Sequence, residues 1–132
     1  MAQKYIVGDL VKVWIDLEIG YQVAEVAGRN PYIPEYILTN WFIEDTIGVI
    51  SVAEDRIMPI PLTSEILQKN GWDKERIYFT HSRIPRIKLC TDSSESKWSV
   101  SINGDIMGGY INYVHELQHI LFAFKIYLEM EV

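Results

Sequence analysis

The sequence contains a single cysteine and no concentrated positive charge. Cys90 has no second cysteine with which to form an internal disulfide, and a reducing compartment is the simple interpretation. The 18 acidic residues outnumber the 12 basic ones, which gives a formal net charge of −6, and no cluster of Lys and Arg exceeds two residues. Because phosphate binding needs a concentrated positive surface, this charge pattern argues against a nucleic-acid partner.

Long hydrophobic runs and several catalytic signatures are also missing. No apolar stretch approaches the roughly 20 residues that a membrane-spanning helix requires. The opening stretch MAQKYIVGDL lacks the apolar core of a signal peptide. The patterns GxxxxGKS/T, GxGxxG, GxSxG and CxxC do not occur. We therefore expect a cytoplasmic protein that has no membrane segment and none of the chemistry that those patterns carry.

The sequence does contain enough apolar material for a folded core. Its 132 residues are 48% hydrophobic and 12% aromatic, which suits one globular domain and argues against disorder. Two sub-parts, 1–60 and 61–132, differ in their patterns, but a unit of roughly 60 residues is marginally stable by itself. We therefore expect a single α+β domain that spans residues 1–132.

The first sub-part has the pattern of a small β structure. Hydrophobic residues alternate or cluster in five short stretches that are separated by turn residues. A loop is expected at NPYIP (30–34), because its two prolines cannot donate to a strand ladder. The pattern predicts an SH3-like β-barrel or a curled antiparallel sheet. The five stretches are GDLVKVWID (8–16), GYQVAEVAG (20–28), EYILTNWFIED (35–45), TIGVISVAED (46–55) and RIMPIPL (56–62).

The second sub-part predicts a short middle helix, a β-meander and a C-terminal helix. For the middle helix, Thr63 is a suitable N-cap, Glu65 lies in the first turn and Gly71 ends the helix. Three strands with polar turns between them are expected to follow. These strands lie within ERIYFTHS (75–82), RIKLCTD (86–92) and KWSVSING (97–104).

The C-terminal helix is expected to run from about Asn112, as its N-cap, to Phe124 or a little beyond. Its apolar residues recur at spacings of three and four, which is the helical period. A second, partly apolar stripe lies nearly opposite the first, so we expect the helix to be buried on two sides. The first stripe holds Val114, Leu117, Leu121, Phe124 and Leu128, and the second holds His115, His119, Phe122 and Ile126.

This helix carries HELQH (115–119), a His-Glu-x-x-His pattern. On a helix, His115 and His119 lie one turn apart and can take two corners of a tetrahedral zinc site. Glu116 would then act as the general base on a zinc-bound water. These three residues define an alternative interpretation, in which the protein is a small zinc-dependent hydrolase.

The third protein ligand of such a site is not where the extended pattern HExxHxxGxxH would place it. Phe122 and Lys125 stand where that pattern has Gly and His. A ligand from upstream would have to be His81, Asp92 or Asp105, and nothing in the sequence selects among them. A chain of 132 residues also has little material for a peptidase cleft. Our first expectation is therefore a protein without a cofactor.

Two phrases give the chain a family resemblance: PIPLTSEILQKNGW (59–72) and YVHELQHILFAF (113–124), with a looser match in KYIVGDLVKV (4–13). They resemble a group of small uncharacterised proteins that are encoded by gut Bacteroidota and by their phages and mobile elements. In that group Gln and Asn stand at the positions of Glu116 and His119, so the resemblance implies no inherited zinc site. The tail KIYLEME departs from the group.

We expect a non-enzymatic accessory protein of phage or mobile-element origin that binds a protein or a small ligand, and we leave a homo-oligomer open. His115 is interpreted first as a half-buried histidine packed against the sheet, and secondly as part of a ligand pocket together with Gln118. Trp41 and Phe42, in the acidic stretch TNWFIED, are the aromatic residues most expected to be exposed for a partner.

Overall fold

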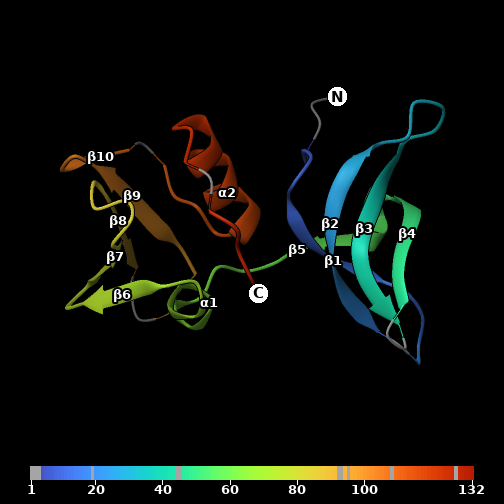
Figure 1. Ribbon diagram of the computed structural model, residues 1–132, viewed down its shortest axis with the longest axis horizontal. Helices are drawn as coiled ribbons and strands as arrows, with labels where there is room; N and C mark the ends of the chain where they lie inside the picture. The colour runs from blue at the N-terminus through green and yellow to red at the C-terminus, as the bar shows by residue number, and fades with distance from the viewer. Residues whose placement is uncertain are drawn as a thin grey trace. The chain divides into compact units, whose positions relative to one another are not determined.

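The protein divides into two compact units, Met1–Ile60 and Pro61–Val132. Each unit holds one five-stranded antiparallel sheet, and two α-helices belong to the second unit (Figure 1). The α+β class is confirmed, whereas the expectation that both units form one domain stays a prediction. The computed structural model describes residues 4–18, 20–43, 46–91, 94, 96–107, 109–126 and 128–132, and describes no side chains for 40–48.

The sheet of the first unit has its strands in the order β4-β3-β2-β1-β5. Its edge strands, β4 and β5, do not pair with each other within the described residues, so the sheet does not close. The short β5 ends at Pro59, which has no N–H donor for a further ladder. An antiparallel sheet is confirmed here, and an SH3-like barrel is not. The strands are β1 (Leu10–Trp14), β2 (Tyr21–Arg29), β3 (Glu35–Ile43), β4 (Thr46–Ala53) and β5 (Ile57–Pro59), with a 3₁₀ turn at Glu54–Arg56.

Alternation along the strands builds the core of the first unit. Val11 and Val13 of β1 are buried, while Lys12 between them is exposed. Tyr36 of β3 packs edge to face against Tyr5 with 5.5 Å between ring centroids. Its hydroxyl oxygen accepts the backbone N–H of Tyr5 at 3.3 Å, which ties the segment before β1 to the sheet. Further members of this core are Ala24, Val26, Leu38, Val52 and Ile57.

The sheet of the second unit is a meander in the order β10-β9-β8-β7-β6, as predicted for this part of the chain. Two of its strands, β6 and β10, were not predicted. The β6 sequence WDKE has no alternation of apolar residues, and β6 exists because it pairs with β7 across a turn in which Arg76 has φ of 55°. The strands are β6 (Trp72–Glu75), β7 (Tyr78–His81), β8 (Ile87–Thr91), β9 (Trp98–Ile102) and β10 (Asp105–Ile106).

The helix α1 spans Ser64–Lys69 and begins and ends as predicted. Thr63 is the N-cap, and its side-chain oxygen accepts the N–H of Ile66 at 3.2 Å. Asn70 is the C-cap, and Gly71 follows it with φ of +87°, a left-handed conformation that favours glycine. Local sequence chemistry therefore sets both ends of this helix.

The helix α2 spans Val114–Ala123, and its N-cap is Tyr113 rather than the predicted Asn112. The left-handed Lys125, with φ of 57°, ends the helix, so Leu128 cannot belong to its apolar stripe. The predicted burial of the second stripe holds for His115, which is 5% exposed, but is wrong for Phe122, which is 63% exposed. Phe124 of the first stripe is 45% exposed. No helix among the residues that the structure describes has the length and apolar character needed to cross a membrane.

The centre of the second unit is built around Trp98 of β9. Its buried indole packs edge to face against Phe79 of β7, and its N–H donates to the carbonyl oxygen of Leu62 at 2.9 Å. Its backbone pairs with Ile111 in an isolated bridge. These bonds tie the segments that precede α1 and α2 to the sheet, and Figure 1 shows α2 beside that sheet. Other buried residues of this unit are Leu67, Ile87, Leu89, Val100, Val114, Leu117 and Leu121.

Candidate functional site

The two histidines of HELQH lie in contact near the start of α2. His115 is only 5% exposed, so it is more deeply buried than predicted, and its ring stacks on that of Tyr113 with centroids 5.8 Å apart. His119 is half-buried and meets His115 edge to face at 5.5 Å. The predicted helical spacing therefore brings the two imidazoles together, with His115 as part of the packed interior.

The carboxylate of Glu116 caps its own helix. Its Oε1 atom accepts the backbone N–H of Asn112 at 2.9 Å and that of Tyr113 at 3.1 Å. Glu116 is the third residue of α2, the position from which a Glu or Gln side chain reaches back in a capping box. A negative charge there also complements the positive end of the helix dipole. The side chain of Glu116 therefore has a structural role at the start of α2.

The candidates for a third zinc ligand are scattered. His81 lies on β7 beside Trp72, and Asp105 is an exposed residue at the start of β10. Asp92 falls outside the described residues. Across the part of the chain that the structure describes, no group of three or more His, Cys, Asp and Glu side chains is placed to hold a metal ion.

The other predicted binding residues lie on α2 and on β3. Gln118 is half-buried on α2. Trp41 and Phe42 lie on β3 in the first unit, within the stretch 40–48 whose side chains the structure does not describe. Their exposure for a partner therefore stays a prediction.

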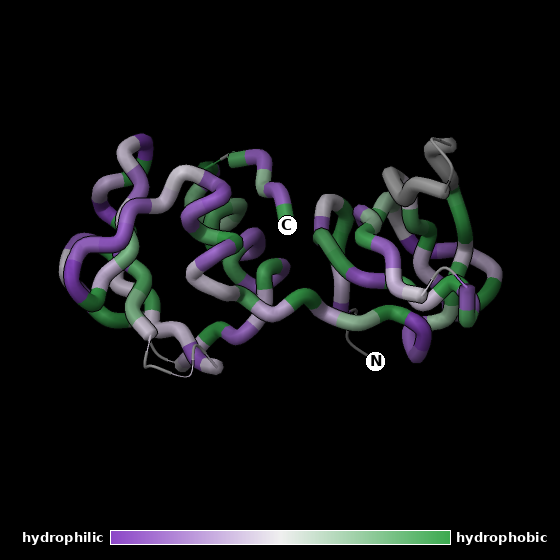
Figure 2. Tube along the Cα trace, turned by 90° about the horizontal axis from the view of Figure 1, so that it is seen from below, coloured by the Kyte–Doolittle hydropathy of each residue, from purple (hydrophilic) through white to green (hydrophobic). Residues whose placement is uncertain are grey.

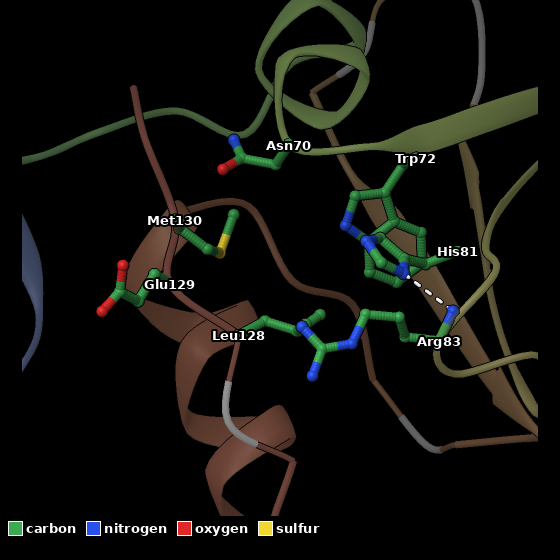
Figure 3. A pocket seen from close by; sticks show the side chains of 7 residues that line it. All are labelled: Asn70, Trp72, His81, Arg83, Leu128, Glu129 and Met130. Carbon is green, nitrogen blue, oxygen red and sulfur yellow. Dashed lines mark hydrogen bonds between the residues drawn. The ribbon is translucent and has the colours of Figure 1, made fainter.

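A pocket that the sequence did not predict lies elsewhere in the second unit, with a volume of about 320 Å³. Its walls come from the end of α1, from β6 and β7, from the turn after β7 and from the segment after α2. Figure 3 shows these side chains gathered around one space. They are Asn70, Trp72, His81, Arg83, Leu128, Glu129 and Met130.

One wall of the pocket is the cross-strand pair of Trp72 and His81. The antiparallel register of β6 and β7 places these two residues directly opposite each other. Side chains of directly opposed residues lie on the same face of a sheet, and here the rings meet edge to face at 5.5 Å. Trp72 is 2% exposed and His81 is 8% exposed, so both rings are almost completely buried.

The orientation and tautomer of His81 follow from its neighbours. Its Nδ1 atom accepts the backbone N–H of Arg83 at 3.1 Å, so the proton of the neutral ring is assigned to Nε2. A Cβ atom at Gly71 would lie 3.1 Å from that Nε2, so only glycine leaves this ring in place without a shift. His81 is therefore a fixed N–H donor on the pocket wall.

The opposite wall is the segment 128–132, which is tied to the end of α1. The side-chain amide of Asn70 donates to the carbonyl oxygen of Glu131 and accepts its N–H, both at 2.6 Å. Apolar and polar residues alternate along this segment (Figure 2). Leu128 and Met130 therefore supply apolar surface to the pocket, and Figure 3 shows the carboxylate of Glu129 directed away from Trp72 and His81.

Comparison with protein-family models, with curated proteins and with solved structures finds no significant match to this chain. The function proposed below therefore depends on the site itself. Sequence reasoning missed the pocket because Trp72 and His81 become neighbours only through the pairing of β6, a strand without an alternating pattern. The phrase NGW (70–72) contains three residues that shape the site. Its only local structural signal is the helix end at Gly71.

Proposed function

We propose that this chain is a non-enzymatic binding protein that takes a small ligand in the pocket of its second unit. The proposal is carried by the almost buried rings of Trp72 and His81, whose nitrogens face one pocket (Figure 3). Small-molecule sites combine apolar walls with convergent polar groups, and this pocket is lined about equally by apolar and polar side chains. Its volume of about 320 Å³ is at the lower end of the range for such sites.

The setting of Glu116 supports binding rather than zinc-dependent hydrolysis. A general base must direct a carboxylate oxygen at the water that it deprotonates. One oxygen of Glu116 instead accepts two backbone N–H groups at the start of α2. Gln can make the same bonds in a capping box, which agrees with the Gln that the resembling group carries at this position.

The proposal includes an origin in a phage or mobile element and a cytoplasmic location. The origin is supported by the resemblance of the phrases 59–72 and 113–124, and the location by the single cysteine, Cys90. These phrases meet in space, because Pro61 bridges to Tyr113 and the N–H of Leu62 donates to the carbonyl oxygen of Asn112 at 3.0 Å. An SH3-like relation of the first unit is also part of the proposal, supported by five antiparallel strands with register shifts at β2–β3 and β3–β4.

The proposed function is tested by ligand screening and metal analysis on the same preparation. The full chain, labelled with ¹⁵N, is mixed with a library of small soluble compounds, and the indole N–H signals of its four tryptophans are followed. We expect hits that move the Trp72 signal and leave the Trp98 signal in place, because the Trp98 N–H already donates to Leu62. A protein without ligand binding in this pocket would give no such hits.

Metal analysis tests the alternative function, which is zinc-dependent hydrolysis. Protein purified without added zinc is analysed for bound metal beside a His119→Ala variant, and hydrolysis of peptide and ester substrates is measured. We expect less than one zinc per chain and no hydrolysis that depends on Glu116. Stoichiometric zinc that is lost in His119→Ala, together with an activity that Glu116→Gln abolishes, would establish the hydrolase and overturn the proposal.

A further inference from the structure

We infer that the pocket of the second unit binds the carboxylate group of a small organic acid, an inference that rests on the proposed ligand-binding function. The pocket places the N–H donors of two largely buried rings, one cationic side chain and an apolar wall around the same space. A carboxylate with a hydrocarbon body matches all three features, since it accepts hydrogen bonds, carries one negative charge and has an apolar part.

The first feature is the indole N–H of Trp72. Trp72 is only 2% exposed, and the structure records no hydrogen-bond acceptor for this N–H among the described residues. Trp98, which is also fully buried, donates to Leu62 at 2.9 Å. The Trp72 nitrogen is not among the buried polar atoms that lack a partner in the described residues, so its N–H opens on the pocket and can donate to a ligand there. Figure 3 shows the Trp72 nitrogen on the side of the ring that faces Asn70 and Met130.

The second donor is Nε2 of His81. Because Nδ1 accepts the Arg83 N–H, the neutral ring offers Nε2–H as a donor. The edge-to-face contact with Trp72 places the two ring centroids 5.5 Å apart. In Figure 3 the Trp72 nitrogen and the His81 nitrogen that is not bonded to Arg83 face the same side. Two N–H donors on adjacent rings suit the two oxygens of one carboxylate.

The charge comes from Arg83. Its guanidinium lines the pocket and extends toward Leu128 in Figure 3, and the structure records no ion pair for it within the described ranges. Arginine is the side chain best suited to hold a planar carboxylate, since its N–H groups form a fixed fork. A ligand carboxylate held by the two ring donors would therefore also have a counter-charge.

The surroundings favour a single negative charge and an organic body over an inorganic dianion. The chain carries a formal net charge of −6, and Glu129 and Glu131 belong to the wall segment. Their repulsion acts on every negative charge of a ligand, so it is weaker for a monoanion than for a dianion. Leu128 and Met130 offer apolar surface that phosphate cannot use but that a hydrocarbon group buries.

The test uses three probes that separate charge from shape: benzoate, its neutral isostere benzamide, and inorganic phosphate. Each is titrated into the ¹⁵N-labelled full chain, and the Trp72 indole signal is assigned with a Trp72→Phe variant. We expect benzoate to move the Trp72 signal saturably while the Trp98 signal stays in place. Benzamide and phosphate should each bind at least about tenfold more weakly, because each lacks either the charge or the apolar body.

Variants of two arginines provide a matched control. Arg83→Gln should weaken benzoate binding about tenfold or more, since a hydrogen bond to a charged group is lost. Arg86→Gln removes a nearby exposed arginine that does not line the pocket, and it should leave benzoate affinity unchanged. Equal weakening in both variants would indicate a general charge effect and would overturn the assignment of Arg83.

The remaining outcomes separate this inference from the proposed function. If benzamide binds as tightly as benzoate at the Trp72 signal, the carboxylate inference is wrong and the proposed binding function stands. If phosphate binds more tightly than benzoate, the pocket is a site for inorganic anions and the inference is again wrong. If no probe moves the Trp72 signal at millimolar concentration, the inference fails, and the library screen alone decides the proposed function.

Discussion

At the scale of single residues, Glu116 and Gly71 each have a role in the second unit that the sequence pattern alone does not show. Glu116 belongs to a zinc-binding pattern in the sequence and to a helix cap in the structure. Gly71 ends α1 and also leaves room for the ring of His81. In each case the role depends on the backbone position of the residue together with its chemical type.

Changes at Glu116 should separate a cap from a catalytic base. Glu116→Gln keeps an oxygen that can accept both backbone N–H groups, so the free energy of unfolding should change by less than about 0.5 kcal/mol. Glu116→Ala removes that acceptor and should cost about 1 kcal/mol. Urea denaturation of the full chain measures both values. An equal loss in the two variants would contradict the capping role and show that the charge itself is needed.

Substitution of Gly71 should affect both stability and the pocket. Gly71→Ala places a side chain at φ of +87° and brings its Cβ to 3.1 Å from Nε2 of His81. The left-handed conformation alone should cost about 1–2 kcal/mol. Gly104→Ala is the matched control, since Gly104 has φ of +88° but no atom within 4 Å of an added Cβ. Only Gly71→Ala should also move the Trp72 indole signal. A similar shift in Gly104→Ala would contradict a specific contact between position 71 and His81.

At the scale of secondary structure elements, α2 is an amphipathic helix with one well-buried face and an exposed Phe122. Leu117 and Leu121 are 0% and 2% exposed and lie on its buried face. Phe122 follows Leu121 directly in the chain, but it is 63% exposed because successive residues of a helix point in different directions. The apolar pattern of the sequence located the helix, while its second stripe is buried at His115 but exposed at Phe122.

Truncation of these residues tests the placement of α2. Leu117→Ala and Leu121→Ala should each lower the free energy of unfolding by about 2–5 kcal/mol, the range for a buried leucine. Phe122→Ala removes a larger but mainly exposed side chain and should cost less than either of them. Thermal and urea denaturation give the comparison. A loss in Phe122→Ala as large as that in Leu117→Ala would mean that the second stripe is covered after all.

At the scale of the whole molecule, the chain consists of two compact units with one sheet each. The first unit has a core of its own around Tyr5, Tyr36 and the valines of β1, and the second has one around Trp98. Units of roughly 60 to 70 residues are marginal when isolated. The expectation of a single domain therefore means that the two units unfold cooperatively, and this can be measured.

A single domain predicts that both units unfold together. The indole N–H signals of Trp14, in the first unit, and Trp98, in the second, report on the two separately. In a urea titration followed by NMR, the two signals should disappear with the same midpoint, which is the usual criterion for a two-state transition. Clearly separated midpoints would show two domains that fold independently.

The sequence by itself determined the elements whose causes are local. Thr63 and Gly71 set the ends of α1 because a capping hydroxyl and a left-handed glycine act within a few residues. The Asn103–Gly104 turn, with φ of 55° and 88°, joins β9 to β10 for the same kind of reason. Strand β1 follows from alternation around Lys12, since a period of two places one face against the core.

Only the tertiary structure decided the candidate site. Trp72 and His81 face one pocket because β6 pairs with β7 in a particular register, and that register depends on the whole sheet. Leu128 and Met130 reach the same pocket because Asn70 binds the backbone of Glu131, 61 residues away along the chain. Contacts of this length are set by the packing of the folded chain. No local pattern encodes them, so the sequence pointed to HELQH while the structure points to the pocket beside Trp72.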